Sequence, residues 1–342
     1  MSMSKRAVGK NGPQVPVIGF GAMGLSSGYG SVGSNEERFK ILDRAIELGS
    51  TFWDTSDVYA DNEDLIGAWF KYSGKRDKVY LCTKFGVTKD DQGQPSIRSD
   101  PDYVRKACER SMKRLGVERI DLWFCHRVDM KTPIEDTVSA MAKLKHEGKI
   151  GAIGLSEVSA RTLRRAYKVH PIAAVQVEYS PFSTEIEDSN IDLLRTCREL
   201  GVTIIAYSPL GRGFLTGQIK SPDDFEEGDF RKFAPRYSQN NFPKNLELVK
   251  SLEKFAAKKG CTPGQLSLAW ILAQGDDIIP IPGTKKIRYL EENVAAAQVQ
   301  LSAQEVEAIR KEIEKTEIVG ERYPPWFENY SFADTPELQD IK

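Results

Sequence analysis

Eight short runs rich in Val, Ile, Leu and aromatic residues recur along the chain. They are mostly apolar rather than strictly alternating, which is typical of strands buried on both faces of a parallel sheet. The eight runs cover residues 15–21, 51–55, 79–84, 120–127, 150–156, 172–179, 202–208 and 278–282. The sequence therefore predicts one large parallel sheet.

Stretches with the periodicity of amphipathic helices separate these runs and follow the last one. They cover residues 35–48, 62–72, 102–115, 134–146, 160–169, 190–200, 263–273, 287–297 and 303–314. Glycine stands where three of these helices should stop, at Gly116, Gly148 and Gly201. Alternating strands and helices indicate right-handed βαβ units, and eight strands are the number that closes a (β/α)8 barrel.

A single closed barrel is favoured over an open doubly wound sheet for two reasons. Open doubly wound sheets usually have fewer strands per domain, and no linker divides the 342 residues into two domains. We expect one α/β domain over residues 1–342, a (β/α)8 TIM barrel with its core at about residues 6–320. An N-terminal β-hairpin is predicted at residues 6–12, where Asn11-Gly12 forms the turn. We also expect an extra C-terminal helix and a functional loop at 209–244. An aromatic tail at 321–342 should pack on the barrel.

Composition excludes several classes of protein. The net charge of -1 gives no general electrostatic reason to bind nucleic acid or anionic lipid. The five cysteines are odd in number and form no CxxC pair, so we expect reduced thiols and no metal site. No stretch reaches the ~18 apolar residues of a membrane span, and Pro16 and several glycines interrupt the apolar stretch near the N-terminus. The sequence therefore predicts a soluble, cytoplasmic protein with a small-molecule partner.

Two stretches fit the GxGxxG pattern, at residues 19–24 and 28–33. The dinucleotide-binding fingerprint requires a strand, then glycines that open a helix directly, then an acidic residue about 20 positions later. Here the first match leads into more Gly and Ser, and helical periodicity begins only near Asn35. We interpret the pattern as a glycine-rich loop able to approach a ligand closely, and not as a Rossmann fold.

Four residues suited to acid–base chemistry stand at consecutive predicted strand ends, where barrel enzymes place their catalytic groups. Asp54 ends the second run, and Tyr59 follows five positions later. Lys84 ends the third run, and His126 lies at the end of the fourth. Together they suit proton donation to a carbonyl oxygen while hydride arrives at its carbon. Lys84 would lower the pKa of Tyr59 from about 10, Asp54 would keep Lys84 charged, and neutral His126 would orient the substrate oxygen or relay the proton.

Each of these four residues also has a structural explanation when taken alone. An Asp before a turn is usually a cap, and a Tyr in Val-Tyr-Ala is usually packing. A Lys after a strand is usually solvated, and a His that ends an apolar strand is usually a core residue. A structural explanation for one of these residues is common, but three adjacent strand ends would seldom all carry such residues by chance. We therefore favour the catalytic interpretation.

These motifs resemble the aldo-keto reductase family. The segment Asp54-Thr-Ser-Asp-Val-Tyr59, Lys84 and His126 are similar to the family's catalytic tetrad in order and context. The resemblance covers roughly residues 6–320, and Gly283-Thr284-Lys285-Lys286 is similar to the cofactor motif of the fungal, plant and bacterial branch. It implies a (β/α)8 barrel that reduces an aldehyde or ketone with NADPH, with Tyr59 as the proton donor.

The same resemblance implies a nicotinamide cofactor site. Ser156 and Gln176 match the positions that bind the carboxamide, and Tyr207 matches the aromatic ring that stacks on the nicotinamide. Backbone amides and lysines at the start of a helix would attract a 2′-phosphate, which favours NADPH over NADH, although the sequence does not decide between Lys285 and Lys286. The remaining residues assigned to the cofactor are Gly21, Met23, Ser208, Leu210, Gly211, Gly213, Gly283, Thr284, Glu292 and Asn293.

The sequence leaves alternatives open for the substrate pocket and for the activity. Pocket candidates are Met23, Trp53, Val58, Arg127, the tail and the 209–244 loop, and Arg127 could bind an acidic substrate or pair with Asp129. One alternative function is a cofactor-binding regulatory subunit with little turnover. Another is a phosphate-binding isomerase or aldolase in which Lys84 forms a Schiff base. The native substrate, reaction direction, stereochemistry and oligomeric state are not encoded in any motif.

Overall fold

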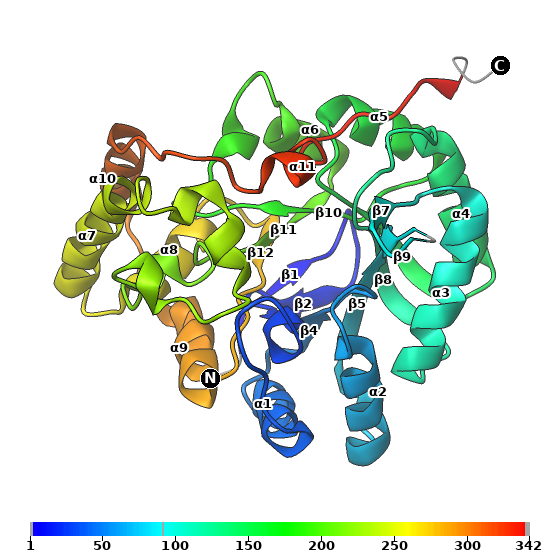
Figure 1. Cartoon of the computed structure of the whole chain (residues 1–342), viewed down its shortest axis with the longest axis horizontal. Coiled ribbons are helices and arrows are strands. Elements are labelled where there is room, and N and C mark those ends of the chain that lie inside the picture. The colour runs from blue at the N-terminus through cyan, green and yellow to red at the C-terminus, as the bar shows by residue number, and fades with distance from the viewer. Residues whose placement is uncertain (1–2, 91, 339–342) are drawn as a thin grey trace.

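Eight parallel strands curl into a barrel at the centre of the molecule, and helices surround it (Figure 1). The computed structural model describes residues 3–90 and 92–338. Within them the barrel strands are β3 (Phe20–Gly21), β4 (Phe52–Asp54), β5 (Tyr80–Phe85), β8 (Ile120–Cys125), β9 (Ile150–Ser156), β10 (Ala174–Glu178), β11 (Thr203–Tyr207) and β12 (Ile278–Pro280). Each predicted run contributes one strand to the barrel, so the predicted (β/α)8 barrel is confirmed.

The barrel closes between its first and last strands through backbone hydrogen bonds. Gly19 N donates to Pro280 O at 2.9 Å, and Gly21 N donates to Pro282 O at 3.2 Å. A Cβ atom at Gly21 would lie 2.7 Å from the Ile281 carbonyl oxygen, so only glycine lets the two segments approach this closely. The glycine-rich stretch therefore serves barrel closure, and the next α-helix begins only at Asn35.

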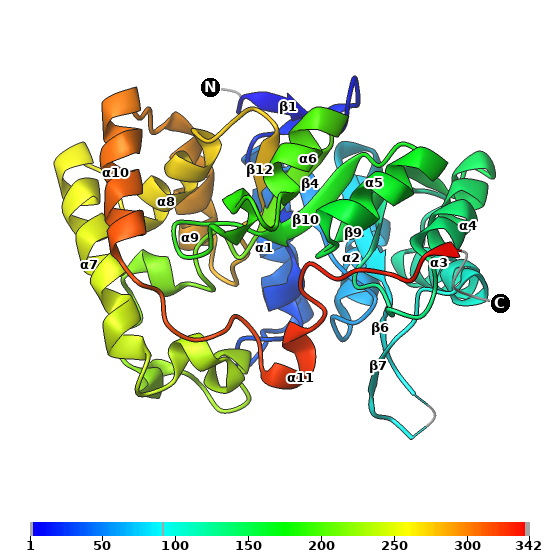
Figure 2. The ribbon, with the colours of Figure 1, turned by 90° about the horizontal axis from the view of Figure 1, so that it is seen from above.

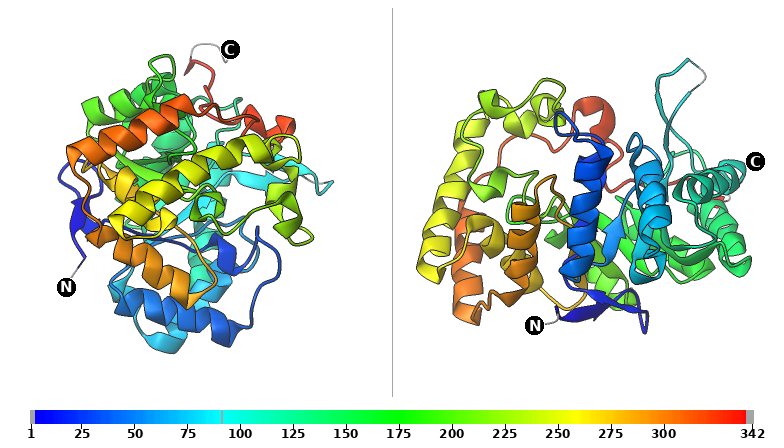
Figure 3. Two further views of the ribbon diagram at one scale, coloured as in Figure 1. Left: turned by 90° about the vertical axis from the view of Figure 1, so that its left-hand side faces the viewer. Right: turned by 90° about the horizontal axis from the view of Figure 1, so that it is seen from below.

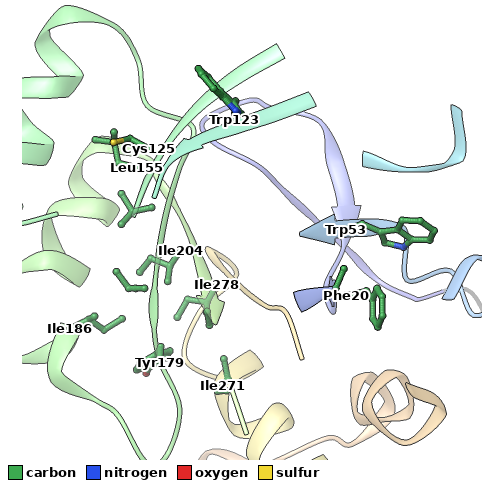
Figure 4. Packing of buried hydrophobic residues seen from close by; sticks show 14 of the residues in the cluster. Phe20, Trp53, Trp123, Cys125, Leu155, Tyr179, Ile186, Ile204, Ile271 and Ile278 are labelled. Carbon is green, nitrogen blue, oxygen red and sulfur yellow. The ribbon is translucent and has the colours of Figure 1, made fainter. Parts of the chain in front are cut away.

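Apolar side chains fill both faces of the barrel wall, as the continuous apolar runs predict. Phe52 and Ile205 belong to the cluster inside the barrel, whereas their neighbours Trp53 and Ile204 belong to the cluster beneath the helices. Figure 4 shows part of this outer cluster, with Phe20 beside Trp53 at a ring-centroid separation of 6.3 Å. The alternation along each strand thus decides which residues can reach the barrel interior.

Helices cover the outside of the barrel, where most of them connect successive strands and the last two follow β12. They are α1 (Asn35–Glu47), α2 (Asn62–Ser73), α3 (Pro101–Leu115), α4 (Ile134–His146), α5 (Ala160–Val169), α6 (Leu193–Leu200), α8 (Pro263–Leu272), α9 (Ile287–Ala295) and α10 (Ala303–Lys315). Helix α6 starts three residues later than predicted because Asp192 has a positive φ of 56° and cannot begin a right-handed helix.

The first predicted run does not form one strand, which corrects the sequence analysis. Its beginning lies in β2 (Gln14–Pro16), which pairs antiparallel with β1 (Lys5–Ala7). The hairpin itself was predicted, and Gly9 and Asn11 in its turn have positive φ. Only Phe20–Gly21 reaches the barrel, after the chain leaves the hairpin. The hairpin lies at the end of the barrel opposite α11 (Pro325–Glu328) (Figure 3).

Helix α7 (Phe242–Lys259) and a second β-hairpin were not predicted. Helix α7 follows the 209–244 segment, which contains four short 3-10 turns: Phe214–Thr216, Pro222–Asp224, Phe230–Phe233 and Pro235–Tyr237. A second hairpin, β6 (Val87–Lys89) with β7 (Pro95–Ile97), projects from the body at the same end of the barrel as α11 (Figure 2). The hairpin lies in a polar stretch without strand periodicity, whereas α7 carries buried apolar residues at helical spacing, at Leu248, Leu252 and Ala256.

The described part of the C-terminal tail lies against the barrel. Figure 2 shows the tail passing across the end of the barrel that carries α11. Ala333 N donates to Glu157 O at 2.8 Å, and Ser159 N donates to Ala333 O at 3.0 Å. Residues 339–342 of the predicted tail lie outside the described residues. In the described part of the chain, no helix has the length and apolarity needed to cross a membrane.

Candidate active site

The structure brings the four predicted acid–base residues together at one end of the barrel. Lys84 Nζ donates to Asp54 Oδ2 at 2.6 Å and reaches Tyr59 OH at 3.4 Å. The rings of Tyr59 and His126 meet edge to face, with centroids 5.8 Å apart. His126 Nδ1 lies 3.1 Å from Ser56 Oγ. Strand register explains the convergence, because neighbouring parallel strands carry Asp54 and Lys84 on their inward faces and His126 directly follows the next strand.

The ion pair at the base of this cluster is buried. Lys84 is fully buried and Asp54 is 4% exposed. Burial alone would lower the pKa of Lys84, but Asp54 and Tyr59 outweigh it and raise that pKa above its ordinary value. Burial raises the pKa of Asp54, and Lys84 and Gln176 oppose this effect. The amine is therefore held as an ammonium ion beside the phenol.

The phenol and the imidazole differ in how their surroundings shift their pKa values. Burial raises the pKa of Tyr59 above its ordinary value and outweighs Lys84, which acts to lower it. The predicted net lowering is therefore wrong, although the predicted effect of Lys84 has the right sign. Burial, followed by Lys84 and Arg127, lowers the pKa of His126 well below its ordinary value. The protonated phenol is thus a hydrogen-bond donor, and the imidazole is neutral, as the sequence analysis expected.

Of the three predicted carboxamide and stacking residues, Ser156 and Tyr207 end β9 and β11, and Gln176 is the central residue of β10. Ser156 is paired in register with Gln176 on the next strand. Gln176 Nε2 donates to Asp54 Oδ1 at 2.7 Å, so its amide also fixes the carboxylate. Tyr207 OH donates to Glu157 Oε1 at 2.8 Å. These side chains form a wall next to the four acid–base residues.

The segments predicted to approach the cofactor phosphates have the backbone of close-contact loops. After β11, Ser208 has a φ of 46°, and Gly211 and Gly213 also have positive φ. On the opposite side, a Cβ atom at Gly283 would lie 2.5 Å from Gly21 O, so these two glycines pack backbone against backbone. The N–H groups of Gly211 and Gly213 donate within the loop, to Ser208 O and Leu210 O, so the glycines contribute close approach of the backbone rather than free N–H groups.

The predicted basic pair lies at the start of α9. Lys285 Nζ donates to Tyr29 O at 2.6 Å and to Ser31 O at 2.8 Å, so it holds the glycine-rich loop. Lys286 is the N-cap residue of α9 and lies over the Tyr289 ring at 5.8 Å. Both lysines are thus near the positive end of a helix, where an anion is favoured.

The two residues assigned to adenine follow within α9. Glu292 Oε1 accepts from Thr262 Oγ1 at 2.7 Å. Asn293 is 5% exposed. The structure thus orients the Glu292 carboxylate towards α8 and places Asn293 on the inner side of the helix.

Two substrate-side expectations need correction. Trp53 is fully buried beneath the helices, where its Nε1 donates to Ser50 O at 2.8 Å, so it cannot line the pocket. The side-chain alternation of β4 explains this, since Asp54 takes the inward position. Arg127 does not take Asp129 as its partner: its guanidinium donates to Ser156 Oγ at 3.1 Å and to Tyr323 OH at 3.3 Å. Asp129 instead accepts hydrogen bonds from the backbone of its own loop.

The aromatic tail, a predicted pocket candidate, brings Tyr323 and Phe327 to the site together with Arg322, which no sequence motif singled out. Arg322 donates from both guanidinium nitrogens to Glu157, at 3.1 and 3.0 Å, in a pair that is almost completely buried. Tyr323 OH lies 2.7 Å from Tyr207 OH. Phe327 packs on Tyr323 with ring centroids 5.1 Å apart. Glu157 could have been noticed as an acid directly after a strand end, but its partner lies 165 residues later.

Part of the 209–244 loop is structural. Arg236 is buried and donates to Ser183 Oγ at 2.6 Å and to Glu185 Oε1 at 2.6 Å. Tyr237 is also buried, and its OH donates to Gly211 O at 3.0 Å. Phe230 reaches the mouth of the barrel, where its ring centroid lies 6.1 Å from that of Tyr323. The loop therefore supports the phosphate-side backbone and contributes one aromatic ring to the mouth.

Comparisons with known proteins agree with this geometry. Residues 17–314 match the model of the aldo/keto reductase family. Aldo-keto reductase str7 of Strobilurus tenacellus is 57% identical over 343 residues, which cover 99% of each chain. Aldo-keto reductase yakc [NADP(+)] of Schizosaccharomyces pombe is 53% identical over 341 residues, again 99% of each chain.

Solved structures give the same result at lower identity. The glycerol dehydrogenase AKR11B4 of Gluconobacter oxydans superposes with a TM-score of 0.82 at 26% identity, covering 93% of this chain and 98% of that one. The aldo-keto reductase AKR11C1 of Bacillus halodurans, in its holo form, gives a TM-score of 0.75 at 25% identity with the same coverage. The chain belongs to the aldo/keto reductase family.

Proposed function

We propose that this protein reduces an aldehyde or ketone to the alcohol with NADPH, and that Tyr59 donates the proton to the carbonyl oxygen. The observation that carries the proposal is the contact of Tyr59 OH with the ammonium of Lys84 at 3.4 Å, in a family member whose His126 ring lies beside the same phenol. A reduced nicotinamide supplies hydride to the carbonyl carbon when it is bound. The side chains of this chain then have to orient the carbonyl and hold a proton at Tyr59 Oη.

Each of the four residues has a separate task in this proposal. Tyr59 holds the proton, and Lys84 stabilises the negative charge left on the phenol after transfer. Asp54 keeps Lys84 charged and fixes its position through the 2.6 Å contact. His126 is oriented by Ser56 at Nδ1, and we assign its Nε2 to the substrate oxygen. Because its pKa is lowered, the imidazole does this in its neutral form.

The cofactor assignment rests on the relatives and on the residues present. The S. pombe relative carries NADP(+) in its name, and the two lysines at the start of α9 suit a 2′-phosphate. We assign Ser156 and Gln176 to the carboxamide and Tyr207 to the ring face. The backbone from Ser208 to Gly213, together with Gly21, Met23, Gly283 and Thr284, is assigned to the phosphates and ribose, and Glu292 and Asn293 are assigned to adenine.

A Schiff-base function for Lys84 fits these surroundings poorly. A nucleophilic lysine needs a neutral amine, and therefore a lowered pKa. Here Asp54 and Tyr59 raise the pKa of Lys84 despite its burial. The substrate side is an aromatic mouth formed by Phe230, Tyr323 and Phe327, next to the guanidinium of Arg127. We propose a small carbonyl compound as the substrate.

The variant Tyr59→Phe tests the proposal. It should keep its NADPH affinity in a fluorescence titration, while turnover of an aldehyde and ketone panel falls by about 10²- to 10⁴-fold, because only the proton donor is lost. Tyr72→Phe, which alters an exposed tyrosine of α2, is the matched control. Unchanged turnover in Tyr59→Phe would refute the role of Tyr59. NADPH binding without turnover in the wild type would favour a regulatory subunit.

A further inference from the structure

The segment that carries Tyr59 is a short irregular loop between β4 and α2. It has no strand or helix of its own from Thr55 to Asp61. Ala60 has a positive φ of 48°, a conformation that non-glycine residues adopt only when their surroundings impose it. Asp57 N donates to Lys84 O at 3.1 Å and fixes the start of the loop, so the position of the phenol further along depends on the contacts that hold the rest of the turn.

Arg114 of α3 holds the loop by its backbone. Its Nη1 donates to Asp57 O at 2.9 Å, and its Nη2 donates to Ala60 O at 2.5 Å. These two carbonyl groups flank Tyr59 in the sequence, so one guanidinium bridges the turn that presents the phenol. The planar, forked guanidinium can make both contacts at once, whereas a point-like ammonium ion cannot.

Two carboxylates of α2 fix Arg114 in turn. Asp64 Oδ2 accepts from Arg114 Nε at 2.9 Å, and Glu63 Oε2 accepts from Nη1 at 3.1 Å. Glu63 is fully buried, and its other oxygen accepts from Thr83 Oγ1 at 2.7 Å. Thr83 directly precedes Lys84 on β5. The chain of contacts therefore links the Tyr59 loop to the strand that presents Lys84.

The distance between the two groups makes this linkage important. At 3.4 Å, the contact between Lys84 Nζ and Tyr59 OH is near the outer limit of a hydrogen bond. A loop displacement of about 1 Å would break it, and misplacement on that scale can cost about 10²-fold in rate. We propose that Arg114 is a positioning residue that fixes Tyr59 relative to Lys84 and the substrate, an inference that rests on the proposed function.

The test compares Arg114→Gln with Arg105→Gln. Arg105 is a matched control because it lies on the same helix and also pairs with two carboxylates, Glu109 and Glu147, but contacts no part of the loop. Arg114→Gln should lower kcat at saturating NADPH by about ten- to a hundredfold. The NADPH dissociation constant should stay within about twofold, and the isotope effect with deuterated NADPH should increase because chemistry becomes more limiting. Arg105→Gln should change none of these three quantities.

A double variant separates positioning from general damage to the fold. In a Tyr59→Phe background, adding Arg114→Gln should change the residual turnover by less than about twofold, because nothing remains to be positioned. A multiplicative loss would overturn the proposal. Arg114→Lys retains the charge opposite Glu63 and Asp64, so it should fold even if Arg114→Gln does not. It should lie between wild type and Arg114→Gln, and wild-type kcat in Arg114→Lys would also overturn the proposal.

The same experiments distinguish the two proposals. If the wild type does not reduce carbonyl compounds, or if Tyr59→Phe retains full activity, the proposed function fails. If Tyr59→Phe is impaired while Arg114→Gln behaves like Arg105→Gln, only the positioning role fails.

Discussion

The two sides of the barrel mouth are held in place by different forces. On one side, Asp54 and Lys84 are placed by the register of adjacent parallel strands, which a continuous ladder of backbone hydrogen bonds maintains. On the other side, the tail is placed by contacts between distant residues, chiefly the buried pair of Arg322 with Glu157 and the contact of Tyr323 with Tyr207. The first arrangement is distributed over many backbone groups, whereas the second combines a few side-chain contacts with two backbone hydrogen bonds at Ala333.

This difference teaches where a single substitution can act. A ladder of backbone bonds survives the loss of one side chain, so substitutions on the first side that leave no buried charge unpaired, such as Tyr59→Phe, should change chemistry more than stability. A buried ion pair loses its compensation when either partner is removed, so substitutions there should change stability more than chemistry. The predictions below test this contrast.

The largest effect is expected for Arg322→Gln. It leaves the fully buried carboxylate of Glu157 without its bidentate partner, and breaking such a pair typically costs about 3–5 kcal/mol. Urea unfolding should show this loss as a lower midpoint with little change in slope. Arg322→Lys keeps the charge and should lose less. A loss below about 1 kcal/mol in Arg322→Gln would show that the tail is held by its other contacts.

A pH-dependent loss of stability should accompany this pair. Burial alone would raise the pKa of Glu157, but Arg322 and Arg127 outweigh it and lower the pKa to about 2. A carboxyl whose pKa is depressed by folding adds stability above its unfolded pKa of about 4.3, and that stability is lost as the pH falls through about 2. The difference corresponds to about 3 kcal/mol. The unfolding free energies of wild type and Glu157→Gln should therefore converge between pH 5 and pH 2, and a constant difference would contradict the assignment.

A smaller effect is expected at the start of α9, on the strand-end side of the mouth. Replacing both Lys285 and Lys286 by Ala should weaken NADPH binding by about tenfold, or about 1.4 kcal/mol, and NADH binding much less. Fluorescence titration of both cofactors measures this difference. Each single variant then shows which lysine matters, since Lys285 already holds the loop through Tyr29 and Ser31. Equal losses for the two cofactors would contradict a role in binding the 2′-phosphate.

The strand-end side could be predicted from the sequence because its signals are local. Apolar runs mark the strands, and Asp54, Lys84 and His126 stand at their ends, so strand order alone predicts that they share one mouth. The alternation of inward and outward side chains along β4 is also a local signal. It places Trp53 on the outward face, next to the inward Asp54, and so excludes Trp53 from the pocket. The net direction of the Tyr59 pKa was missed for another reason, since burial depends on the finished fold.

The tail side could not be predicted in the same way. No pattern in the sequence links Arg322 to Glu157, and the same holds for the bonds from Arg114 to the Tyr59 loop more than 50 residues away. Helix α7 did leave local signals, since Pro243 lies in its first turn and Gly260 ends it in a left-handed conformation. The spacing of Leu248, Leu252 and Ala256 is a further local signal, so α7 could have been predicted from the sequence.

The smallest effect is expected for Arg161→Gln, the exposed counterpart of Arg322. Arg161 also joins the barrel to the tail, through Asp334 at 3.3 Å and Glu337 at 2.9 Å, but its side chain is 57% exposed. Exposed ion pairs contribute about 0–1 kcal/mol, and salt screens them. Urea unfolding should therefore show a loss of that size at low salt, which disappears at about 1 M NaCl, where the Debye length is about 3 Å. The loss in Arg322→Gln should persist at the same salt concentration, because burial excludes the screening ions. If salt removed the stability loss in both variants, or in neither, burial would not be the difference between the Arg322 and Arg161 ion pairs.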